Sequence, residues 1–219
     1  MKPLDVKKFK RDLTTLLERL KNKYKVNSEE LDKIKEKLIK LYTKGLVKIN
    51  HSALELLCAH NLLKMGYKVN VEHKLSEDLI CDVYGLKGDG ALIIEIETGF
   101  VPPEYALEPL IYNKARIVSK IARYSAYAAK FSLGTPPNNL LPISAIFQKP
   151  PRYRTQDEVM SLKNLCDLYY TKPPITIEQL RNAKLHSIFI LDIDNCNVYE
   201  IDLESYIQRV STTSFLESL

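Results

Sequence analysis

Three carboxylates stand at the ends of two apolar stretches. Acidic side chains are unfavourable in a buried core, so their presence at these positions needs a reason. Asp82 ends one stretch, and Glu95 and Glu97 end another. Because side chains alternate between the faces of a strand, Glu95 and Glu97 project from one face, roughly 7 Å apart. The glycine-rich connector 85–90 predicts a hairpin that brings Asp82 beside that face. Three oxygen donors are therefore expected to converge.

Such a cluster suits a hard divalent cation, Mg²⁺ or Mn²⁺, which prefers carboxylate and water oxygens. A single Glu-x-Glu on a solvated strand face is the ordinary alternative. Residues 91–96, however, begin apolar on both faces, which is typical of a buried central strand. Charges at the end of a buried strand are costly unless they are paired or bind a metal.

Composition places the chain among ordinary globular proteins. Its 219 residues fit one domain with elaborations, and the apolar and charged fractions are 45% and 27%. No run approaches 18 apolar residues and no secretory core follows the Lys-rich start, so we expect a cytoplasmic protein with no membrane partner. Cys58, Cys81, Cys166 and Cys196 stand far apart, which favours buried reduced thiols over a zinc site or disulfides.

The net charge of +5 is distributed unevenly along the chain. Residues 1–50 hold 15 basic and 7 acidic residues, whereas the rest carries a net −3. Apolar periodicity predicts two amphipathic helices in this segment, with Lys7, Lys8, Lys10 and Arg11 toward solvent. A basic surface attracts nucleic acid by neutralising phosphates, but a plain solvated helix face is an equal interpretation. Covering the core, mediating dimerisation and contacting nucleic acid are three roles open to the helical pair, and periodicity does not choose among them.

The remaining pattern predicts an α/β fold, with a central mixed β-sheet flanked by helices. We expect a basic helical arm over 1–50, a core over 51–150 and a C-terminal αβ extension over 151–219 packed on that core, all in one structural domain. The expected elements are a helix at 51–65 carrying Glu55, strands at 67–75, 79–85 and 91–98, a helix at 111–131, a strand at 141–147, helices near 155–170 and 176–184, and strands at 187–193 and 198–203.

The order of helix, three strands, helix and strand over roughly 51–147 resembles the core of the PD-(D/E)XK nuclease superfamily. The resemblance implies a restriction-endonuclease-like αβββαβ core in which Asp82 and Glu95 hold Mg²⁺ and Glu55 is an auxiliary acid. In that superfamily a strand Lys, two residues beyond the Glu, helps to orient the nucleophile. Glu97 occupies that position here, and would hold a second ion or orient water.

The replacement of the strand Lys by Glu97 makes basic residues of the next helix candidates for its role. A few restriction endonucleases of the superfamily carry Glu at the strand position, and in other branches a basic residue moves to the following helix. Lys120 and Tyr124 are similar in layout to the Gln-x-x-x-Tyr element of RecB-like nucleases, which implies roles in catalysis or DNA contact for Lys120 and in DNA contact for Arg123 and Tyr124. Residues at that spacing share a helix face, and also occur on surface helices with no special role.

The layout and size are also similar to nucleases of archaeal spindle-shaped viruses and to archaeal Holliday-junction resolvases. That likeness implies branched recombination or repair DNA, the host cytoplasm and a homodimer or higher homo-oligomer. Arg152 and Arg154 flank Tyr153 and would suit phosphate contact and base stacking, against the alternative of a plain surface loop. His51 lies one turn before Glu55, where a structural role is the commoner one.

The expected function is a Mg²⁺-dependent (or Mn²⁺-dependent) DNA nuclease. Its expected catalytic residues are Glu55, Asp82, Glu95, Glu97 and Lys120, with Asp82, Glu95 and Glu97 as metal ligands. The alternatives are a non-catalytic DNA-binding protein that retains the fold and a structural oligomer whose acids decorate the surface.

Overall fold

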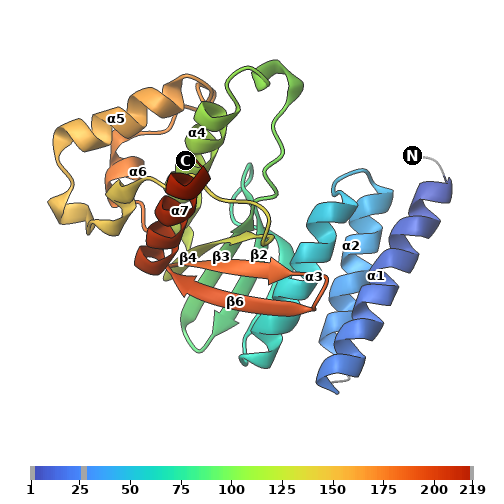
Figure 1. Ribbon diagram of the computed structural model, residues 1–219. Coiled ribbons are helices and arrows are strands. Elements are labelled where there is room, and N and C mark those ends of the chain that lie inside the picture. The colour runs from blue at the N-terminus through green and yellow to red at the C-terminus, as the bar shows by residue number, and fades with distance from the viewer. Residues whose placement is uncertain (1–2, 26–28, 218–219) are drawn as a thin grey trace.

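The computed structural model describes residues 3–25 and 29–217, and one six-stranded sheet runs through it (Figure 1). The strands lie in sequence order, β1 to β6. The β3–β4 and β4–β5 pairs are parallel and the other pairs antiparallel, so the sheet is open and mixed, and the predicted α/β class is confirmed. The strands are β1 (Lys68–Lys74), β2 (Ile80–Lys87), β3 (Gly90–Ile96), β4 (Lys130–Thr135), β5 (Ser187–Asp192) and β6 (Asn197–Asp202).

Helices cover both faces of the sheet and enclose two apolar cores. The first core joins β1, β2, β3 and β5 to the three N-terminal helices, and the second joins β3, β4 and the other face of β5 to the later ones. Consecutive helices α1 to α3 therefore lie on one face (Figure 1). The helices are α1 (Pro3–Tyr24), α2 (Glu29–Thr43), α3 (Ile49–Lys64), α4 (Pro109–Tyr124), α5 (Gln156–Asp167), α6 (Ile177–Asn182) and α7 (Leu203–Glu217).

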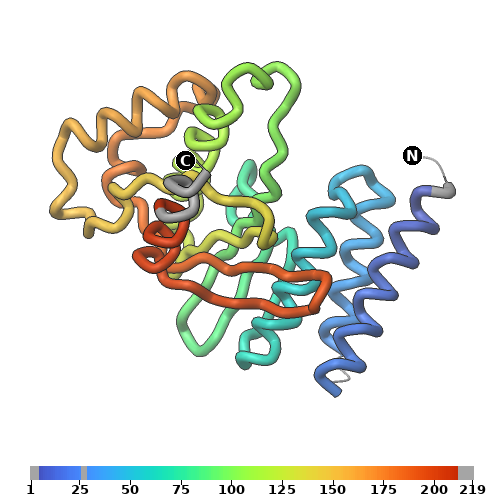
Figure 2. Tube along the Cα trace, viewed as in Figure 1, coloured from blue at the N-terminus to red at the C-terminus, as the bar shows by residue number. Residues whose placement is uncertain are grey.

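The N-terminal helical pair packs against α3 and does not stand apart as an arm (Figure 2). Phe9 and Leu13 of α1 and Leu31 and Leu38 of α2 are fully buried in the first core. The opposite face of α1 is basic and exposed, as its amphipathic pattern predicted, and includes Lys7, Lys8, Lys10 and Arg11. Covering the core is thus one role of this pair.

Two predicted elements of the second half are wrong. The helix expected over 111–131 ends at Tyr124, and the chain then forms β4. The strand expected at 141–147 is irregular and ends in a short 3-10 helix, Ala145–Gln148. Pro142 has no N–H for a sheet ladder, which argues against a central strand there. The sequence pattern also gave no sign of α7.

Strand β4 was missed because one of its faces carries small or polar side chains. Phe131 and Leu133 are buried on the face covered by α4, whereas Ser132 and Gly134 face the other way. A Cβ atom at position 134 would lie 3.0 Å from Leu191 Cδ1, so the sheet packs closely here. The resulting apolar alternation covers only four residues, which is the lower limit for recognising a strand from its pattern.

The four cysteines are buried and free. Among the described residues, we find no helix with the length and apolar character needed to cross a membrane.

Candidate active site

The site lies where β2 and β3 separate. Their ladder runs from Lys87 and Gly90 to Val83 and Ile94, and beyond that point two carboxylates replace it. The Asp82 N–H donates to Glu95 Oε1 at 2.9 Å, and the Ile96 N–H donates to Asp82 Oδ2 at 2.6 Å. These bonds satisfy backbone donors that the diverging strands would otherwise leave unpaired. The predicted approach of Asp82 to Glu95 is confirmed.

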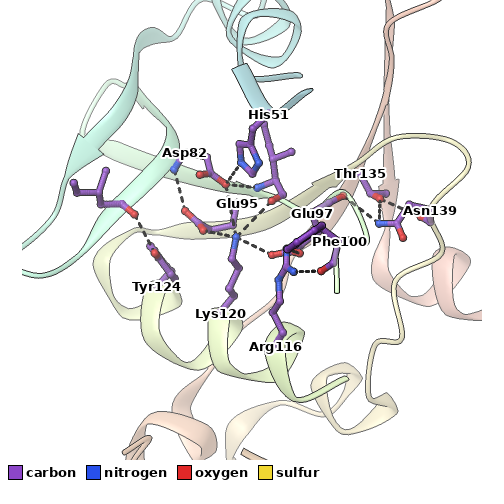
Figure 3. Close-up of polar contacts among 12 residues, drawn as sticks. His51, Asp82, Glu95, Glu97, Phe100, Arg116, Lys120, Tyr124, Thr135 and Asn139 are labelled. Atoms are coloured by element: carbon purple, nitrogen blue, oxygen red, sulfur yellow. Dashed lines mark hydrogen bonds and ion pairs between the residues drawn. The ribbon is translucent and has the colours of Figure 1, made fainter. Parts of the chain in front are cut away.

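Helix α4 inserts a lysine among the three carboxylates expected to bind metal (Figure 3). Lys120 Nζ lies 2.9 Å from Glu95 Oε2, 2.7 Å from Glu97 Oε1 and 3.8 Å from Asp82 Oδ2. Burial lowers the pKa of Lys120, but the three carboxylates together raise it well above the ordinary lysine value. A permanent ammonium therefore stands among the oxygens that were expected to surround a cation.

Glu97 has a second cationic partner on the same helix. Arg116, one turn before Lys120, pairs with Glu97 Oε2 and donates to the Phe100 carbonyl at 2.6 Å. The two Glu97 oxygens thus face two different cations, and the side chain is almost fully buried. We call Glu95, Glu97, Arg116 and Lys120 the lysine cluster.

The backbone of Glu97 is fixed from the neighbouring strand. Its N–H donates to the Gly134 carbonyl at 2.7 Å, and Asn139 Nδ2 donates to its carbonyl at 3.1 Å. Asn139 Nδ2 also reaches Thr135 Oγ1 at 2.9 Å, which ties the segment after β3 to the end of β4 (Figure 3). The lysine cluster is therefore held by both its ion pairs and its backbone.

Helix α3 supplies a different set of groups on the other side of Asp82. His51 Nε2 lies 3.0 Å from Asp82 Oδ2, and the two side chains form an ion pair when the imidazole is protonated. Donor atoms of His51, Glu55 and Asp82 all lie within 4.8 Å of one another. We call these three residues the histidine cluster.

Glu55 is the anomaly of this cluster. Its side chain is fully buried, and neither carboxylate oxygen meets a hydrogen-bond donor among the described residues. Burial raises the pKa of Glu55 well above its ordinary value, and the negative charges of Asp82 and Glu72 raise it further. A buried carboxylate without a partner is stable only if it takes up a proton or meets a cation.

The shared aspartate and its strand neighbour titrate in opposite directions. Burial raises the pKa of Asp82, but Lys120 and His51 outweigh burial and hold it at about 2. Burial and the charge of Asp82 raise the pKa of Glu95 to about 8, against the opposing effect of Lys120. Asp82 is therefore the constant anion of the site. For His51, burial lowers the pKa, but Asp82 reverses this and leaves it raised.

Two of the residues predicted to contact DNA have partners within the protein. The Tyr124 hydroxyl donates to the Ile80 carbonyl at 3.0 Å and so fastens α4 to the start of β2. Arg123 donates to the Pro173 carbonyl at 2.9 Å, and its guanidinium lies 5.5 Å from the Tyr170 ring centre. Both contacts leave the predicted DNA roles untested.

The predicted DNA role of Arg154 is wrong. Its side chain is only 4% exposed, and its guanidinium donates to backbone carbonyls of residues 149, 180, 181 and 183. Residues 180 and 181 lie in the last turn of α6 and residue 183 follows it, so Arg154 caps the C-terminal end of this helix and ties it to residue 149. Arg152 is exposed, with its guanidinium 4.7 Å from the Tyr153 ring centre.

The structure adds three residues to the predicted set. A structural role was expected for His51, although its four-residue spacing from Glu55 places both on one helix face. Arg116 has the same spacing from Lys120, a signal that sequence reasoning did not use. Glu72 of β1 contributes charge near Glu55 and Asp82, and no motif marked it.

Comparisons with known proteins add no functional assignment. No family model matches the chain, and no curated protein matches it. Among solved structures, it is similar to a protein of unknown function from Silicibacter pomeroyi, with 11% sequence identity and a TM-score of 0.32 over 73% of this chain and 82% of the other. A likeness at this level carries no argument about function.

Proposed function

We propose that this protein is a divalent-metal-dependent nuclease that hydrolyses phosphodiester bonds of DNA. The observation that carries the proposal is the position of Lys120 beside Asp82 and Glu95, with His51 and Glu55 on the other side of the same aspartate. The element order α3-β1-β2-β3-α4-β4 supports a restriction-endonuclease-like core. Lys120 would then serve in place of the strand lysine that Glu97 replaces.

The histidine cluster is the part of the site whose residues fit a metal ion. It combines one imidazole with two carboxylates, and the buried oxygens of Glu55 meet no hydrogen-bond donor among the described residues. An imidazole among carboxylates favours Mn²⁺, and Mg²⁺ is the harder alternative. When bound there, a divalent cation would polarise a phosphoryl oxygen and lower the pKa of an attacking water.

The lysine cluster would stabilise the charge that develops on the phosphate. Glu95 and Glu97 hold the Lys120 ammonium beside Asp82, and Arg116 holds Glu97. A charge fixed before the reaction needs no reorganisation during it, which is the main advantage of such groups. We therefore assign Glu97 to the positioning of Lys120 and not to metal binding, in a change from the sequence-based expectation.

DNA is proposed as the substrate because α1 carries an exposed basic face, and phosphate neutralisation needs such a surface. By resemblance, the proposal extends to branched recombination or repair DNA, to a homodimer or higher homo-oligomer, and to an intracellular setting such as the cytoplasm of an archaeal host. Arg123, Tyr124 and Arg152 remain proposed DNA contacts, although the partners of the first two restrict how far they can reach.

A non-catalytic DNA-binding protein is the second candidate. It is favoured by one observation: the position of the strand lysine is held by Glu97, which is locked between Lys120 and Arg116. A site stabilised by internal ion pairs can persist after activity is lost.

Cleavage assays separate the two. The purified chain is incubated with linear, branched and single-stranded DNA in Mg²⁺, Mn²⁺ or EDTA, beside Asp82→Asn and the control Asp78→Asn, which alters an exposed residue of the β1–β2 turn. We expect metal-dependent products from the wild type and the control but not from Asp82→Asn. DNA binding without cleavage in either metal would favour the non-catalytic alternative.

A further inference from the structure

Strand β1 departs from regular geometry at Glu72, opposite the shared aspartate. Val71 pairs with Val83 and His73 with Cys81, so the register places Glu72 across from Asp82. Glu72 itself has a φ of 45°, in the left-handed region that residues other than glycine rarely adopt. Both strands that flank β2 are thus irregular beside Asp82, β3 because it diverges and β1 because it bends.

The Glu72 side chain is half-buried, and all three residues of the histidine cluster affect its pKa. Burial raises its pKa and the charge of Asp82 raises it further, whereas His51 lowers it. Its carboxyl group also interacts with that of Glu55 through a side-chain hydrogen bond that lowers the Glu72 pKa, and such a bond requires a proton on one of the two carboxyls. Carboxyl groups gathered in this way repel one another unless protons or a cation intervene.

A lysine from the N-terminal helical pair supports this irregular backbone. Lys37 of α2 donates to Asn70 Oδ1 at 2.9 Å, to the Val71 carbonyl and to the Glu72 carbonyl at 3.2 Å. Its ammonium therefore satisfies carbonyls next to the bend. Burial lowers the pKa of Lys37, while Glu72 and Glu55 oppose that effect.

We propose that Glu72 is a further oxygen donor to the cation at the histidine cluster, and that Lys37 is a positioning residue that holds Glu72 for this role. The inference rests on the proposed metal site, whose independent support is the buried Glu55 carboxylate, which meets no hydrogen-bond donor among the described residues. Divalent ions of this class take six or more ligands, so three protein donors leave positions for a fourth and for water. The N-terminal helical pair is then a support of the metal site as well as a cover for the core.

Mn²⁺ binding to the full chain tests this without relying on cleavage. Affinity is measured by titration calorimetry and by the electron paramagnetic resonance signal of free Mn²⁺, with circular dichroism to confirm folding. We expect Glu72→Gln to weaken binding about 10-fold or more, and Lys37→Met about 10-fold, in the range for groups that orient metal ligands. Glu77→Gln and Lys33→Met alter exposed residues of the same types nearby and should bind as the wild type does.

Four further results decide the matter. Lys37→Arg keeps a cationic donor and should restore most of the affinity lost in Lys37→Met. If Lys37→Met fails to fold, Lys37→Gln takes its place, and wild-type affinity in that variant would overturn the positioning role. Wild-type affinity in Glu72→Gln, with binding lost in Glu55→Gln, would overturn the role of Glu72 but leave the metal site intact. Wild-type affinity in Glu55→Gln as well would remove the metal site itself.

Discussion

The two sides of Asp82 treat buried negative charge in opposite ways. In the lysine cluster, Glu95 and Glu97 face cations supplied by α4, Lys120 for both and Arg116 for Glu97. In the histidine cluster, Glu55 is equally buried, and among the described residues no cation forms an ion pair with it. Both clusters lie at the same split between strands, yet only one is neutralised by the chain itself.

The lysine cluster therefore holds a cation that is already in place, whereas the histidine cluster holds a buried carboxylate without a paired cation. A buried ion pair with good geometry can form part of the folded protein without any ligand. An unpaired buried carboxylate must instead be protonated or bind a cation, so the histidine cluster responds to pH and metal. Asp82 belongs to both clusters and couples them.

Replacing the shared residue should have the greatest consequence. Asp82→Asn removes the anion that faces both clusters, with almost no change in volume, so we expect single-turnover cleavage to fall by about 10³-fold or more. The thermal transition should remain cooperative, as followed by circular dichroism. Retained cleavage would show that neither cluster acts through Asp82.

The lysine cluster is tested alone by Lys120→Met. Loss of one preorganised charge should slow single-turnover cleavage by about 10²-fold, while DNA affinity changes little. Lys114→Met changes an exposed lysine of the same helix and serves as the control. If binding drops instead and turnover at saturating DNA survives, Lys120 is a phosphate contact and the charge is not part of the chemistry.

Arg116 tests whether the lysine cluster is neutralised internally. Arg116→Met leaves Glu97 with Lys120 alone, so we expect a loss of about 2 kcal/mol in the free energy of unfolding, below the usual cost of leaving a buried charge entirely unpaired. The double variant with Glu97→Gln should lose less than the sum of the single variants, as measured by urea unfolding. Simple additivity would mean that the two side chains are not coupled.

The histidine cluster should show itself in the pH dependence of stability. The pKa of Glu55 is raised in the folded state, so its contribution is fully present below its unfolded pKa of about 4.3 and is lost as pH rises through the higher folded value. Metal-free protein should therefore lose stability as pH rises above about 4.3, the pKa of Glu in the unfolded chain. Glu55→Gln should flatten this fall in urea unfolding at a series of pH values, and an unchanged slope would assign the effect to another group, Glu95 first.

Much of the site was accessible to sequence reasoning because its signals are local. Charges at the ends of apolar strands and a glycine-rich turn predicted the approach of Asp82 to Glu95, and the resemblance to RecB-like nucleases singled out Lys120. The arrangement of the metal ligands was not accessible in the same way. It depends on β2 and β3 separating at Asp82, which exposes that residue to α3, and a strand pattern does not reveal where a ladder ends.

The remaining failures have the same origin in long-range contacts. Strand β4 is defined by its parallel pairing with β3 and β5, because its own alternation covers only four residues. Arg154 was predicted to contact DNA at the surface, but its partners are backbone carbonyls. A sequence pattern does not show which carbonyls an arginine will contact. Glu72 was missed because its place depends on a bend in β1 and on Lys37 from another helix.

The most direct test is a comparison of Mn²⁺ binding by Glu55→Gln and Glu97→Gln, two equivalent substitutions on opposite sides of Asp82. If the histidine cluster holds the cation, Glu55→Gln should weaken binding about 10-fold or more in titration calorimetry, whereas Glu97→Gln should bind as the wild type does. Loss of binding in Glu97→Gln, with wild-type binding in Glu55→Gln, would place the metal among the carboxylates that now surround Lys120 and contradict the division of the site proposed here.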